Sequence, residues 1–127
     1  MEESSALRFA KSHEWLRLES DGATIGISDH AQEELGDVAL VLLPEIGRML
    51  QAGEKFGEVE SIKAVSDLYS PVAGLVIEVN ETLLDSPEFV NDDPYGEGWM
   101  VRLQIADADE IDALMDADEY DHYLGEI

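Results

Sequence analysis

The stretch that decides the fold is GEVESIKAVSDLYSP, which occupies residues 57–71. Residues of strand character lie on both sides of Lys63, over residues 56–60 and 64–70. Two such runs with a short break between them predict a β-hairpin that carries Lys63 near its tip. A hairpin tip holds an amine in solvent on a rigid support, where a modifying enzyme can reach it. This is the geometry that a carrier domain needs, since its attached group must visit separate active sites.

The segments before this hairpin predict a second hairpin followed by a helix. Residues 15–19 and 23–27 have strand character, and Asp21-Gly22 between them favours a tight turn. Ser28 or Asp29 is a suitable N-cap for a short helix that ends at Leu35, with Gly36 as its C-terminal stop.

Further strands are predicted on both sides of the lysine hairpin. Residues 37–43 form a mostly apolar run that ends at Pro44, and residues 75–79 are similar. Residues 99–105 alternate as a half-buried strand does, with Met100 placed on the more polar face.

A weak internal repeat relates the two flanks of the hairpin. Residues 43–50 share an apolar pattern with residues 76–83, and Gly47 corresponds to Asn80. Gly and Asn best tolerate the left-handed backbone of a tight turn. The chain is therefore predicted to be mainly β, folded as a flattened barrel-sandwich hybrid with internal pseudo-symmetry.

The C-terminal segment, about residues 107–124, has helical character. The tetrapeptide DADE occurs at residues 107–110 and again at 116–119, each time followed by apolar residues at helical spacing. Acidic residues in a first turn favour the positive end of a helix dipole, so two short helices packed on the strands are predicted. An EF-hand calcium loop is excluded, because its glycine and spaced oxygen ligands are missing.

Composition limits the class of protein. The chain has 127 residues, 30 Asp plus Glu against 7 Lys plus Arg, a formal charge of −23, 45% hydrophobic residues and no cysteine. This length predicts one domain over residues 1–127, expected to be a monomer. The charge disfavours nucleic acid and anionic membranes as partners. No apolar run approaches ~20 residues and the N-terminus lacks a basic start, so a cytoplasmic protein is expected.

Signatures of catalysis are weak. The three histidines, His13, His30 and His122, have no metal-ligand spacing, so no metal site is predicted. With 30 carboxylates, any chosen acid–base pair is uninformative. Lysine is scarce, and only Lys63 of the three lysines lies at a predicted hairpin tip.

The stretch 57–71 resembles the lipoyl-lysine hairpin of the glycine cleavage system H-protein family. The resemblance continues in KSHEW (11–15), GISDHAQ (26–32) and NDDPYGEGW (91–99), and covers about residues 9–124. It implies a carrier that is not itself an enzyme, with lipoate joined to Lys63 by an amide bond. It also implies four kinds of partner: the pyridoxal-phosphate glycine decarboxylase, the tetrahydrofolate-dependent aminomethyltransferase, dihydrolipoamide dehydrogenase and lipoate-attaching enzymes.

The same resemblance places residues around the arm. Ser12 and Glu14 occupy the positions that receive the cationic end of the methylamine-loaded arm, and Asp67 beside the hairpin is a second candidate. His30 is placed in the same groove. A carboxylate and hydroxyls at the edge of an apolar groove suit a protonated amine.

Five alternatives are to be weighed at this point. An H-like protein serving lipoate relay, or a lipoyl domain of another complex, would use the same lysine and fold. A biotinyl domain is disfavoured, because Ile62-Lys63-Ala64 stands where Met-Lys-Met is usual. An enzyme using Glu14 with His13 or His30 lacks a supporting constellation, and an acidic interaction module would leave Lys63 unmodified.

Overall fold

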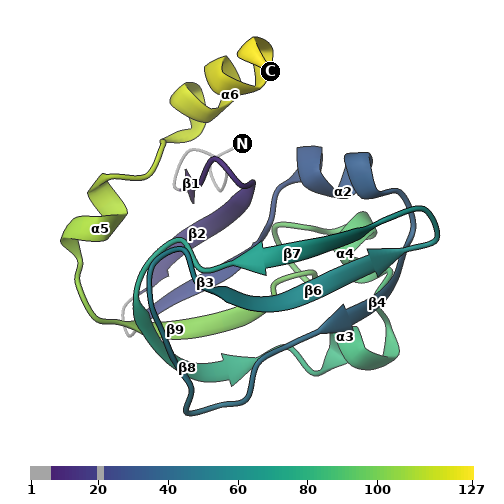
Figure 1. The fold of residues 1–127 in the computed structure, drawn as a ribbon, viewed down its shortest axis with the longest axis horizontal. Coiled ribbons are helices and arrows are strands. Elements are labelled where there is room, and N and C mark those ends of the chain that lie inside the picture. Colours follow the sequence, from purple (N-terminus) through teal and green to yellow (C-terminus); the bar gives the residue numbers. More distant parts are fainter. Residues whose placement is uncertain (1–6, 20–21) are drawn as a thin grey trace.

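The computed structural model describes residues 7–19 and 22–127, and its strands form two antiparallel sheets (Figure 1). Sheet A has the strand order β1-β2-β3-β9-β8-β5 and sheet B the order β4-β6-β7. The strands are β1 (Leu7–Phe9), β2 (Glu14–Glu19), β3 (Gly22–Ile27), β4 (Val38–Leu42), β5 (Met49–Leu50), β6 (Lys55–Ser61), β7 (Val65–Tyr69), β8 (Gly74–Val79) and β9 (Val101–Ile105). The mainly β prediction is confirmed, and the Ser20-Asp21 part of the predicted first turn lies outside the described residues.

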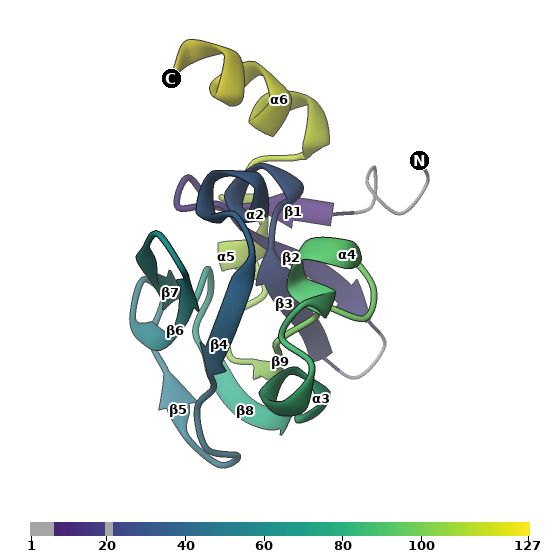
Figure 2. The same cartoon turned by 90° about the vertical axis from the view of Figure 1, so that its right-hand side faces the viewer.

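Short helices complete the described fold. They are α2 (Asp29–Leu35), α3 (Thr82–Asp85), α4 (Phe89–Asp92), α5 (Asp109–Asp112) and α6 (Ala117–Glu126). Figure 2 shows α6 set apart above α2 and β1, at the opposite end of the molecule from α3. Within residues 7–19 and 22–127, no helix is long and apolar enough to cross a membrane.

Local chemistry explains two of these helices. Ser28 caps α2 by accepting a hydrogen bond from the Ala31 amide, and Gly36 ends the helix with a φ of +79° that favours glycine. Asp116 and Glu119 form a capping box at the start of α6. The structure contains both α5 and α6, so the two C-terminal helices predicted from the DADE repeat are confirmed.

The main core lies between the two sheets. Residues with at most 1% exposure come from both: Leu16, Ile25 and Leu103 from sheet A, and Val59 and Leu68 from sheet B. A second, smaller cluster joins β1 and β2 to α6, and its buried members are Leu7, Phe9, Trp15 and Tyr120. The C-terminal helix α6 is thus attached through a cluster of its own.

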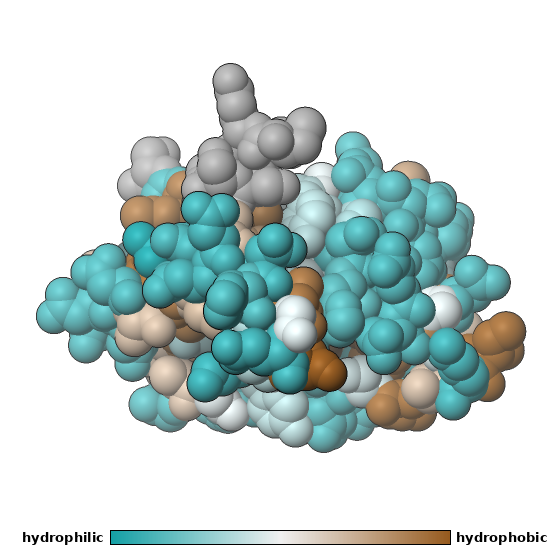
Figure 3. Space-filling model, turned by 90° about the horizontal axis from the view of Figure 1, so that it is seen from above, coloured by the Kyte–Doolittle hydropathy of each residue, from teal (hydrophilic) through white to brown (hydrophobic). Residues whose placement is uncertain are grey.

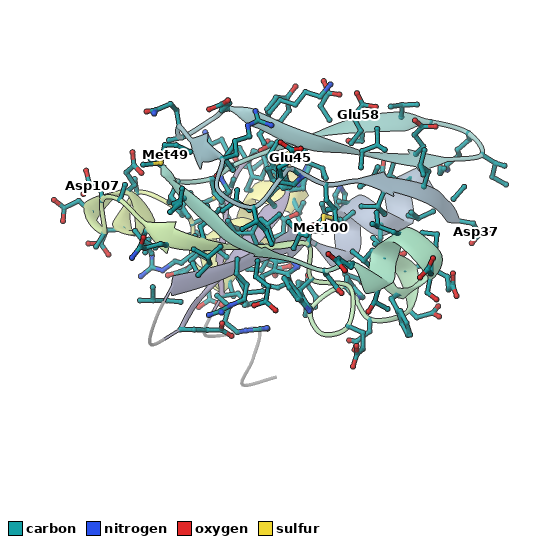
Figure 4. The ribbon with its side chains drawn as sticks, turned by 90° about the horizontal axis from the view of Figure 1, so that it is seen from below. Asp37, Glu45, Met49, Glu58, Met100 and Asp107 are labelled. Atoms are coloured by element: carbon teal, nitrogen blue, oxygen red, sulfur yellow. The ribbon has the colours of Figure 1, made fainter. Side chains whose placement is uncertain are left out.

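Two details of the predicted strands are wrong. Met100 does not lie on a polar face: it is fully buried, its amide donates to the Ile25 carbonyl, and Figure 4 shows it in the middle of the molecule. Asn80 does not adopt the left-handed turn that Gly47 adopts, since His13 is the one non-glycine residue with positive φ in the described chain. Its side chain instead donates to the Glu97 and Trp99 carbonyls, both at 2.8 Å.

Gly57 is required where β6 pairs with the end of β4, which gives a first testable prediction. A Cβ at this position would overlap the Leu42 carbonyl oxygen. Gly57→Ala should therefore push β4 away and lower the free energy of unfolding by about 1–3 kcal/mol, measured in urea. The control is Gly125→Ala on α6, where a Cβ meets nothing within 4 Å. Equal stability of the two variants would contradict this view of sheet B.

Candidate functional site

The turn between β6 and β7 carries Lys63. The last strand pair before it is Glu60 with Val65, and the Ser61 amide donates to the Ala64 carbonyl at 2.8 Å. The Ser61 hydroxyl accepts from the Lys63 amide at 3.3 Å and from the Ala64 amide at 3.1 Å. The predicted position of Lys63 at a hairpin tip is therefore confirmed, and one serine fixes the turn.

Lys63 differs from the other lysines in its surroundings. Lys55 is bound to the carboxylates of Glu58 and Asp67, at 2.7 and 3.2 Å, and the Lys11 amine lies 5.8 Å from the centre of the Tyr123 ring. No ion pair within the described part of the chain includes Lys63. Its side chain is exposed.

The surface next to Lys63 is apolar. Ile62 is 87% exposed and Val65 62% exposed, and both flank the lysine at the turn. Figure 3 shows a hydrophobic patch at the right-hand end of a mostly hydrophilic face, where Figure 1 places the β6–β7 turn. An apolar patch around a modifiable side chain is suited to recognition by another protein.

A groove of about 440 Å³ runs between α2 and β7. All four predicted docking residues line it: Ser12, Glu14, His30 and Asp67. Ile127, near the C-terminus, also lines the groove. The remaining apolar wall comes from α2, β3 and β7, through Ile27, Ala31, Leu35, Val65 and Leu68. The structure therefore brings these sequence-distant residues together beside the lysine hairpin.

Glu14 is not at the edge of the groove, as predicted, but buried in it. Its side chain is 1% exposed, and its carboxylate accepts hydrogen bonds from the Ser12 hydroxyl and, at 2.9 Å, from the Tyr69 amide. The Tyr69 bond crosses from sheet A to sheet B. Burial raises the pKa of Glu14 to about 7, and the hydrogen bonds from Ser12 and Tyr69 oppose this rise without cancelling it.

Asp67 lines the same groove with a carboxylate that is already engaged. One oxygen lies 3.2 Å from the Lys55 amine, and the other accepts from the Tyr69 hydroxyl at 3.4 Å. Its charge is thus shared with a lysine, whereas none of the ion pairs of the described residues includes Glu14. Of the two carboxylates, the one at Glu14 is therefore without a cationic partner among the described residues.

Comparison with known proteins places this geometry in a family. The model of the glycine cleavage H-protein family matches residues 7–127. The chain belongs to this family. It is similar to the glycine cleavage system H protein of Rubrobacter xylanophilus, with 57% identity over 120 residues that cover 94% of this chain and 93% of the relative. The Staphylococcus epidermidis H protein is 49% identical over 122 residues, covering 96% and 97%.

A solved structure agrees with the fold. The crystal structure of a glycine cleavage system H protein from Mycobacterium marinum superposes with a TM-score of 0.88 at 38% identity, covering 95% of this chain and 98% of the other. The barrel-sandwich fold of lipoyl carriers is therefore confirmed for this chain. Members of the H-protein family carry lipoate on a lysine and act as carriers in glycine cleavage.

Around the groove of this H-protein family member, the structure adds a contact that the sequence did not predict. The His13 Nδ1 atom lies 2.7 Å from the Tyr120 hydroxyl, which lies 2.7 Å from the Ser28 hydroxyl. Burial lowers the pKa of His13, and the nearby His30 ring, 4.9 Å between centroids, adds to this. Burial also raises the pKa of Tyr120 to about 12. No local pattern links His13 to Tyr120, because 107 positions separate them.

Tyr120 should hold α6 on the rest of the chain, which gives a second prediction. Its ring stacks on Phe9 at 4.3 Å, so Tyr120→Phe keeps the stacking and loses only the hydroxyl bonds to His13 and Ser28. The variant should lose about 1–2 kcal/mol of stability, with faster hydrogen exchange in α6. The control is Tyr123→Phe, whose hydroxyl makes a long 3.4 Å bond to the Lys11 carbonyl. Equal exchange in both variants would contradict this role.

No metal centre is apparent among the residues that the structure describes. No group of three or more His, Asp or Glu side chains within them could hold an ion. His122 is exposed on α6, 3.6 Å from Glu126, and takes no part in the groove.

Proposed function

We propose that Lys63 is the lipoylated lysine of this chain. With lipoate in place, the protein shuttles the methylamine group of glycine from the glycine decarboxylase to the aminomethyltransferase, and catalyses neither reaction. The observation that carries the proposal is the position of Lys63: an exposed lysine, outside every ion pair of the described residues, on a fixed turn beside an apolar groove.

The residues present fit a lipoyl arm. The Lys63 amine is accessible for an amide bond, and the groove offers an apolar wall for a hydrocarbon chain, including Ile27 and Leu35. When bound, lipoate supplies the redox sulfur chemistry. The chain itself has no cysteine, so no thiol of its own competes with the cofactor by disulfide exchange.

We infer a division of labour among the groove residues. Glu14 holds the cationic end of the methylamine-loaded arm, with the Ser12 hydroxyl beside it. His30 lines the wall of the groove, and Asp67 is a secondary acceptor because Lys55 already shares its charge. A buried carboxylate with few competing waters binds an ammonium group more strongly than an exposed one does.

The partners follow from the glycine cleavage system. We propose that the chain meets the glycine decarboxylase, the aminomethyltransferase, dihydrolipoamide dehydrogenase, which reoxidises the arm, and the enzymes that attach lipoate. We further infer that residues 1–127 act as one monomeric carrier domain in the cytoplasm. The exposed apolar residues beside Lys63 give these enzymes a common surface to recognise.

The test is a peptide mass spectrum of the protein purified from its own host. A peptide that covers residues 58–69 should carry the mass of a lipoyl group on Lys63, and peptides with Lys11 or Lys55 should not. The purified carrier should then accept a methylamine group from the decarboxylase and glycine. An unmodified Lys63 in cells with an intact lipoate pathway would refute the proposal.

A further inference from the structure

The Lys63 side chain lies against the end of α2. A Cβ added at Gly36 would come within 3.2 Å of the Lys63 Cε atom, 3.8 Å of Nζ and 3.9 Å of Cδ. The lysine stem therefore passes over Gly36, which has no side chain to obstruct it. Leu35, which precedes Gly36, and Ala64, which follows Lys63, both line the groove. The contact thus stands at the end of the groove where α2 and the hairpin approach each other.

The backbone around Gly36 is held in place by Asn91 of α4. The Asn91 Nδ2 group donates to the Gly36 carbonyl and to the Gln32 side chain, both at 2.9 Å. Its Oδ1 atom accepts from the Val38 amide at 2.8 Å. One side chain therefore joins the end of α2 to the start of β4, and its hydrogen bonds hold the backbone under the Lys63 stem.

The direction of the stem matters most after acylation. The free ammonium of Lys63 is attracted to the negative end of the α2 dipole, a turn that has no basic residue of its own. An amide carries no charge and loses this attraction. After acylation, the position of the stem depends on steric fit alone, that is, on the space that the missing side chain of Gly36 leaves for it.

We propose that Gly36 is a positioning residue for the carrier arm. Its missing side chain lets the Lys63 stem lie against α2, so that the attached group starts at the end of the groove, and Asn91 keeps this corner rigid. The inference rests on the proposed lipoylation of Lys63. It assigns the start of the arm, whereas the docking residues concern its far end.

The first test needs no lipoate. In the unmodified protein, nuclear Overhauser contacts should join the ε-protons of Lys63 to the α-protons of Gly36. The contacts should weaken in Asn91→Asp, which keeps an oxygen for the Val38 amide and loses the donor to Gly36. A Lys63 side chain that shows no contact with Gly36 would overturn the inference, whatever the lipoylation state.

The second test uses matched variants of the lipoylated, methylamine-loaded carrier. Water supplies the carbonyl oxygen of formaldehyde while the carbon–sulfur and carbon–nitrogen bonds of the loaded group both break, which leaves the free thiol and ammonium. This loss should be faster by on the order of fivefold in Gly36→Ala and in Asn91→Asp. Gly53→Ala is the first control. Gly53 has a φ of +82°, close to that of Gly36, but a Cβ added there would meet no atom within 4 Å. Asn80→Asp is the second, since Asn80 also donates two bonds to carbonyls.

The outcomes separate the two proposals. If the parent chain takes no lipoate on Lys63, the proposed function fails and the role of Gly36 in positioning the arm fails with it. If all chains are lipoylated equally and the variants lose methylamine no faster than their controls, the role of Gly36 is refuted and the proposed function stands. If Gly36→Ala does not fold, the rate of methylamine loss from Asn91→Asp, compared with that from Asn80→Asp, tests the inference.

Discussion

Lys63→Arg should abolish lipoylation and leave the fold intact. Arginine keeps the positive charge and offers no amine that can form the amide bond. The side chain is exposed and outside the described ion pairs, and arginine keeps both the aliphatic stem beside Gly36 and the positive charge, so the melting temperature should change little. After treatment with a lipoate ligase and lipoate, the intact mass of the variant should equal its calculated mass without an adduct.

The other lysines supply matched controls for this result. Lys11→Arg and Lys55→Arg should both take one lipoyl group, although Lys55→Arg perturbs the ion pairs with Glu58 and Asp67. Methylamine transfer should be seen only with the variants that carry a lipoyl adduct. Lys11→Arg and Lys55→Arg should support full transfer, and Lys63→Arg none. Lipoate attached to Lys63→Arg would place the modification elsewhere.

Glu14→Gln should make the protein more stable at alkaline pH and a poorer carrier. The pKa of Glu14 rises from 4.5 to about 7 because its charge is buried. The folded state therefore favours the protonated carboxyl, and the stability that this group contributes is complete below pH 4.5 and lost as the pH rises to about 7. At about 1.4 kcal/mol per pKa unit, the charged form costs about 3 kcal/mol above that range.

Glutamine removes this cost and keeps the geometry. Its amide oxygen can accept from the Tyr69 amide while its NH₂ group donates to the Ser12 hydroxyl. Unfolding in urea at pH 8 should show Glu14→Gln to be more stable than the parent by up to about 3 kcal/mol, a difference that disappears near pH 4. Glu34→Gln, at an exposed carboxylate of the same groove, is the control and should show no such difference.

The same substitution should shorten the life of the loaded arm. Without a negative charge at position 14, the ammonium end has no buried counter-ion, so methylamine should be lost to water faster than from the parent. Decay of the loaded species, followed by mass spectrometry without the aminomethyltransferase, measures this. If Glu14→Gln is less stable than the parent at pH 8 and loses methylamine at the same rate as the parent, Glu14 serves only to bridge the two sheets.

Local sequence predicted the elements whose cause is local. The lysine hairpin, the helix between Ser28 and Gly36 and the two C-terminal helices follow from turn residues, caps and spacing within a few positions. Two short strands, β1 and β5, were not predicted, because strands of three and two residues depend on their partners rather than on a pattern of their own. The helices α3 and α4 were missed for the same reason of length.

The sequence predicted which residues line the groove, but not how deeply they are buried or which groups they contact. The resemblance supplied Ser12, Glu14, His30 and Asp67, and the structure brings them into one groove. It could not supply the burial of Glu14, because that depends on an amide of β7 that lies 55 positions away. The Lys63 stem over Gly36 is likewise a contact between segments that no periodicity joins.

The two sheets differ in when they can form during synthesis. All of sheet B lies between Val38 and Tyr69, whereas β3 of sheet A pairs with β9, with Ala23 opposite Leu103. A chain growing on the ribosome therefore completes the lysine hairpin well before sheet A can close. An attaching enzyme that reads only the hairpin can act on nascent chains, and one that reads the whole carrier must wait for release. Ribosome-bound chains stalled just after β9, with the hairpin outside the exit tunnel and β9 still inside it, would distinguish the two by whether they accept lipoate.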